Sequence, residues 1–95
     1  MDMSGLPGAD LIERGLSDLA AGRESVEALL VGIAAPRLRR LGIAVPDVPQ
    51  AEHRLYARLA GDDPDAAHGK YNAYLRRLTS FERALECAIR QTSPR

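Results

Sequence analysis

Apolar residues recur at helical spacing over most of this chain. Between residues 8 and 21 they form one stripe with a period of about 3.6 residues, made by Leu11, Ile12, Leu16, Leu19 and Ala20. Residues 23–35 repeat the pattern, and Gly22 between them is typical of the residue that follows a helix end. The 4-3 spacing also runs through Gly22, so one continuous helix is possible. We favour two helices in a hairpin.

Proline and glycine mark the middle of the chain. Pro36 lacks the N–H group that a helix interior needs, so it predicts either a kink or the first turn of a short helix that ends at Gly42. The two prolines of "IAVPDVP" predict an extended connector. Asp47 and Gln50 then predict a capped start for a third helix, which runs to Ala60.

The last predicted helix, residues 64–91, has the most regular pattern. Asp62 or Asp63 is expected to cap it, with Pro64 in its first turn. Its apolar residues step by four and three, which is typical of a coiled-coil seam; they are Ala67, Tyr71, Tyr74, Leu78, Phe81, Leu85 and Ala88. The helix would be about 42 Å long, whereas a compact domain of this size is about 32 Å across. We therefore expect it to extend beyond the rest of the domain.

These patterns predict an all-α fold, a small antiparallel helical bundle of four to five helices with a long C-terminal helix. The 95 residues suffice for a single helical domain, in which residues 1–7 and 92–95 are expected to be frayed. Hydrophobic residues at 45% and charged residues at 27% are ordinary for a globular protein and unlike a disordered chain.

Charge, cysteine content and hydropathy narrow the setting. The net charge is zero, but residues 1–35 and 47–69 are net acidic (−4 and −3), and residues 36–46 and 70–95 are net basic (+3 and +4). The lone Cys87 forms no internal disulfide, and no apolar run reaches the ~18 residues of a membrane span. The first residues lack the pattern of a signal peptide. A cytoplasmic protein without membrane contact is expected.

No residue pattern predicts catalysis. A crowd of acids and one histidine precedes and begins the last helix, but helix capping accounts for Asp62, Asp63 and Asp65 without a metal ion. Cys87 has no histidine nearby in sequence, and no glycine-rich phosphate loop is present. We therefore predict no enzyme activity, no cofactor, no metal site and no small-molecule substrate.

Our main functional hypothesis concerns the seam of the last helix. If the helix extends beyond its domain, the apolar side chains near its end are exposed, and exposed apolar patches mark interfaces. The sequence then indicates a non-catalytic interaction or accessory protein of bacterial type, which forms a homodimer or docks a helical partner. The predicted interface residues are Tyr71, Tyr74, Leu78, Phe81 and Leu85.

The alternative hypothesis is a nucleic-acid-binding regulator with an arginine-rich surface. Its candidate residues are Arg37, Arg39, Arg40, Arg76, Arg77 and Arg83. Arg76, Arg83 and Arg90 recur every seven residues on the side opposite the seam, so they face water and can either follow phosphates or form a solvated surface. Because the seam aromatics point away from these arginines, the last helix alone does not form a surface for both base stacking and phosphate binding.

Overall fold

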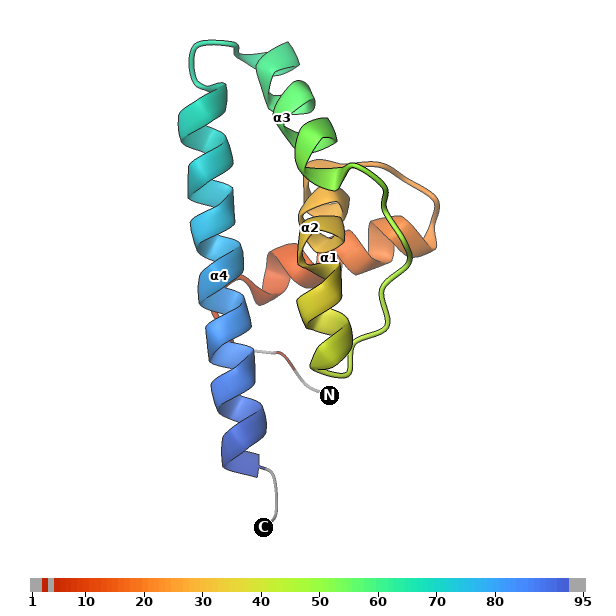
Figure 1. Cartoon of the computed structure of the whole chain (residues 1–95), viewed down its shortest axis with the longest axis vertical. Coiled ribbons are helices and arrows are strands. Elements are labelled where there is room, and N and C mark those ends of the chain that lie inside the picture. The colour runs from red at the N-terminus through yellow and green to blue at the C-terminus, as the bar shows by residue number, and fades with distance from the viewer. Residues whose placement is uncertain (1–2, 4, 93–95) are drawn as a thin grey trace.

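The computed structural model describes residues 3 and 5–92, which form four helices and no strand. The helices are α1 (Ala9–Ala20), α2 (Val26–Arg40), α3 (Ala51–Asp62) and α4 (Ala67–Thr92). Figure 1 shows α2, α3 and α4 running in alternating directions along the long axis of the molecule, while α1 lies across this axis and packs on α2. The prediction of an all-helical fold with a long C-terminal helix is therefore confirmed.

The connection between α1 and α2 confirms two separate helices. Gly22 adopts a φ of 72°, a left-handed conformation without steric cost for glycine, and the chain turns there. Ser25 caps α2, because its hydroxyl oxygen accepts a hydrogen bond from the Ala28 N–H at 3.0 Å. The Ser25 hydroxyl in turn donates to buried Asp18 at 2.6 Å, and Arg23 donates to the same carboxylate at 3.2 Å. This network fixes the angle between the two helices.

Helix α2 continues through Pro36 to Arg40, so a separate short helix after residue 35 is wrong. Pro36 is exposed, whereas Ala34, Ala35 and Leu38 are buried. One backbone hydrogen bond is lost at the proline, but burial of the flanking apolar side chains stabilises the helix on both sides of it.

Helix α3 starts later than predicted. Its first residue is Ala51, and Gln50 precedes it with a φ of 55° and no side-chain hydrogen bond to the helix start. The predicted cap by Asp47 is therefore wrong, because the helix begins four residues beyond it. The helix also runs to Asp62, two residues past the predicted end.

Helix α4 begins at Ala67 rather than at Pro64, and it is unbroken through Gly69. The Asp63 carboxylate accepts a hydrogen bond from the Ala66 N–H at 3.3 Å, so it caps the turn before the helix. We call the segment 62–66 the acidic turn, because it carries Asp62, Asp63 and Asp65.

Two apolar clusters form the core, and α2 contributes to both. The first lies among α1, α2 and α4, and its largest buried members are Ile12, Val31, Leu38, Phe81 and Leu85. The second lies among α2, α3 and α4, and includes Leu29, Leu30, Leu55 and Leu59. Helix α2 is thus covered from two sides, which positions α3 and α4 relative to each other.

The molecule is elongated, with extents of 49 × 26 × 19 Å. The 26 residues of α4 span about 39 Å and account for the long dimension. Met3 and Leu6, which belong to a segment predicted to be frayed, pack against the first cluster; residues 1, 2, 4 and 93–95 of the predicted frayed ends lie outside the described residues. Within the described part of the chain, no helix has the length and apolar character of a membrane span.

Candidate functional site

The seam of α4 lies inside the chain's own core. Phe81 is 0% exposed and Leu85 is 1% exposed, and Leu78 is buried beside them. Tyr71 and Tyr74 are half-buried against the second cluster. The expectation that the far end of the seam is exposed is therefore wrong, because α1 and α2 already cover it.

The arginines fall into two groups by their partners. In the first group, the guanidinium lies within 4.0 Å of a carboxylate: Arg14, Arg23, Arg37, Arg54, Arg58 and Arg90. In the second, no carboxylate of the described residues lies that close: Arg39, Arg40, Arg76, Arg77 and Arg83. Five of the six predicted nucleic-acid-binding arginines belong to the second group. Their charges are not neutralised by a direct ion pair within the described chain.

Three of these arginines lie on the outer side of α4. Arg76 and Arg83 line a shallow hollow of about 450 Å³, together with Asn72, Leu75, Thr79 and Ser80. Arg77 is exposed at the other edge, where it lines a second hollow with Pro7 and Gly8. We call the six residues of the first hollow, with Arg77, the α4 arginine face. No carboxylate lines either hollow.

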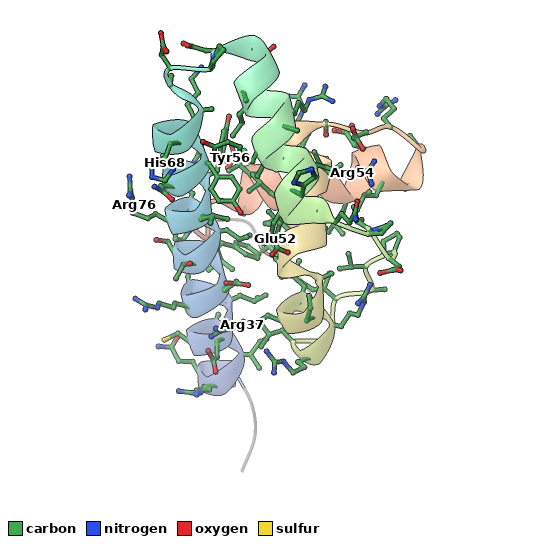
Figure 2. All side chains as sticks on the ribbon, turned by 45° about the horizontal axis from the view of Figure 1, so that its top comes forward. Arg37, Glu52, Arg54, Tyr56, His68 and Arg76 are labelled. Atoms are coloured by element: carbon green, nitrogen blue, oxygen red, sulfur yellow. The ribbon has the colours of Figure 1, made fainter. Side chains whose placement is uncertain are left out.

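One exposed aromatic ring lies near the start of this face. Tyr56 of α3 is 39% exposed, and it is the large hydrophobic side chain that the described chain leaves most open. Its ring contacts the Tyr71 ring edge-on, with centroids 5.5 Å apart and an angle of 66° between the planes. Figure 2 shows Tyr56 between α3 and α4, and Arg76 projecting outward from α4. Tyr56 and the polar residues of the hollow were not among the predicted site residues.

The predicted arginines of α2 do not join the α4 arginine face. Arg37 donates a hydrogen bond to Glu86 at 2.7 Å, and this bond lowers the pKa of the Glu86 carboxyl. Arg39 donates to the backbone oxygen of Val45 at 2.9 Å. In Figure 2 Arg37 lies against the lower part of α4, apart from Arg76. The six predicted arginines therefore form two separate groups.

Glu82 separates these two groups of arginines. It is half-buried, and burial raises the pKa of its carboxyl, an effect that the charges of Arg37 and Arg40 oppose. With Glu86 it offsets the positive charge at the end of α2. The α4 arginine face has no such acid, so it is the stronger candidate for binding an anion.

A third surface is apolar. Leu16 and Ala20 of α1 line a shallow hollow with Ala44, Val45 and Pro46 of the connector. Most of the accessible lining atoms are carbon, which is typical of a protein-docking surface.

No group of three or more His, Cys, Asp and Glu side chains in the described part of the chain is arranged to hold a metal ion. Comparison with known proteins finds no match to a family model, to a curated protein or to a solved structure. The functional argument therefore rests on the surfaces of this chain.

Proposed function

We propose that the protein is a small non-catalytic binding protein that contacts an anionic partner through the α4 arginine face. The observation that carries the proposal is the pairing pattern: Arg76, Arg77 and Arg83 have no carboxylate partner, whereas most arginines elsewhere in the chain do. A guanidinium without an internal partner offers its N–H donors and its charge to a carboxylate or phosphate from outside.

The length of the face supports a macromolecular partner. Arg76 and Arg83 are seven residues apart on one side of the helix, a distance of about 10.5 Å along the axis. The hollow between them is shallow and open, so it does not enclose a small molecule. An extended polyanion can contact both guanidiniums at once.

Retention on a heparin column tests the proposal. We expect the wild-type protein to bind at low salt and to elute as salt rises, because salt competes for the polyanion. The triple variant R76Q/R77Q/R83Q is expected to pass through the column, since it lacks the unpaired guanidiniums.

The matched control is R14Q/R54Q/R58Q, which removes the same three charges from arginines paired with Glu27 and Glu24. We expect this control to elute like the wild-type protein. If the two triple variants elute together, retention reflects net charge alone and the α4 arginine face is not the binding surface.

A second candidate function is protein–protein interaction, as a homodimer or with a helical partner. It is favoured by the apolar hollow of Leu16, Ala20, Ala44, Val45 and Pro46. In this case the contact lies between α1 and the connector, and not at the seam of α4.

A further inference from the structure

We infer that the anionic partner is a single-stranded nucleic acid, whose phosphates lie on the α4 arginine face and one of whose bases stacks on Tyr56. This inference rests on the proposed function and adds the class of partner. It is carried by three observations: an exposed aromatic ring, a row of side chains that leads from it to the arginines, and the absence of carboxylates among the residues that line the hollow.

The ring of Tyr56 is placed for stacking. It is held by its contact with Tyr71, yet 39% of the residue remains accessible. A ring that is fixed on one side and open on another loses little conformational entropy when a base lies on it. Stacking on an aromatic side chain is tolerant of sequence because every base has an aromatic face.

A continuous row of side chains connects this ring to the arginines. Tyr71, Leu75, Thr79 and Arg83 follow one another at four-residue spacing, so each lies one turn beyond the last. The parallel row contains His68, Asn72, Arg76 and Ser80. The rows span about 18 Å from Tyr71 to Arg83, and phosphates in one stacked strand are about 3.4 Å apart, so about five of them fit along the face.

The surroundings favour nucleic acid over an acidic peptide. The lining combines an apolar side chain, Leu75, with hydroxyl and amide groups and two guanidiniums. A peptide rich in carboxylates has no group that matches an exposed tyrosine ring, whereas a nucleotide carries both an anion and a flat aromatic base.

A single strand fits better than a duplex. In a duplex the faces of the bases are covered by their neighbours, so Tyr56 would have no base to stack on. The α4 arginine face also lies on the outside of one helix, next to the acidic turn, and a second strand adds phosphates without adding arginine partners. The structure thus indicates backbone binding with one stacked base, independent of sequence.

Fluorescence anisotropy with the full chain tests the inference. The probes are a labelled oligothymidine of about 12 nucleotides, within the usual site sizes, a duplex of the same length, and a poly-glutamate peptide of similar charge. We expect the single strand to bind more tightly than either of the others. Y56A should weaken it about five- to hundred-fold, and Y56F should leave it unchanged because the ring is kept.

The salt dependence separates the roles of the two groups. We expect Y56A to keep the wild-type slope of log K against log salt, because no phosphate contact is lost. R76Q/R83Q should make the slope shallower by about 1.4, at about 0.7 for each lost contact. Far-UV circular dichroism checks that each variant is folded.

Equal affinity for the duplex, equal affinity for poly-glutamate, or wild-type affinity in Y56A would each overturn the inference. If heparin retention still depends on Arg76, Arg77 and Arg83 in such a case, the proposed function stands and only the partner class is wrong. If that dependence is also missing, both are wrong.

Discussion

Gly15 is the point at which α1 and α2 approach most closely, and its replacement by alanine is a sensitive test of the fold. A Cβ atom there would lie 2.3 Å from the Glu27 carbonyl oxygen and 2.5 Å from a Val31 methyl group. The carbonyl belongs to the backbone of α2 and cannot rotate away. Ordinary contact requires at least about 1 Å more separation, so α1 must move away from α2.

The magnitude follows from two opposing effects. Alanine is a better helix former than glycine by about 0.5–1 kcal/mol, but overpacking a close contact costs about 1–3 kcal/mol and occasionally more. Because the obstructing atoms are mostly backbone and the displaced helix covers Phe81, we expect the upper part of that range. The expected net loss in the free energy of unfolding is about 2 kcal/mol, and the melting temperature should fall by about 8–16 °C.

Urea denaturation followed by circular dichroism measures this loss. The matched control is Gly69→Ala in α4, where a Cβ atom meets nothing within 4 Å. We expect this control to be more stable than the wild-type protein by about 0.5–1 kcal/mol, because only the helix propensity changes. A G15A variant that is as stable as the control would show that α1 and α2 are not in close contact at Gly15.

Two further predictions concern the core and the network at Asp18. Phe81→Ala should lower the free energy of unfolding by about 3–5 kcal/mol, because it empties a fully buried site; an unchanged urea midpoint would contradict the burial of the seam. The hydrogen bond from Ser25, together with that from Arg23, lowers the pKa of Asp18, so its stabilisation is present above the unfolded pKa of about 3.9 and is lost as pH falls through the folded value. Between about pH 5 and about pH 2 the wild-type protein should therefore lose more stability than Asp18→Asn, and equal losses would show that Asp18 is not part of this titration.

The helices could be predicted because each carries its own apolar stripe, but some of their ends could not. Gly22 ends α1 as expected, because a glycine with positive φ is a local feature. The start of α3 depends on the backbone of Gln50, whose left-handed conformation has no signal in the residue type. Pro36 was ambiguous because its tolerance depends on the packing of its neighbours, which are buried only in the folded chain.

The seam of α4 shows how far periodicity extends. The 4-3 spacing correctly places Leu78, Phe81 and Leu85 on one side of the helix, but it does not say which element covers them. Helix α1 lies across the bundle and, with α2, buries these side chains. The close approach at Gly15 that permits this crossing was also missed, because a glycine inside a helical pattern gives no indication of what lies opposite it.

The candidate site was predicted in part. The exposure of Arg76 and Arg83 follows from their position opposite the seam, and the structure confirms it. The pair between Arg37 and Glu86 joins residues 49 positions apart, so sequence spacing could not assign it. The exposed ring of Tyr56 was missed for a related reason, since its surroundings come from α4.

The acidic turn and the unpaired arginines give this neutral molecule a separation of charge along its length. A polyanion that approaches by diffusion is repelled near the turn and attracted farther along α4, so Arg83 meets it first. Capture and retention then depend on different residues: the arginines set the rate of association, which salt slows, and the ring of Tyr56 sets how long the complex lasts. Zero net charge is thus compatible with oriented loading of a charged strand.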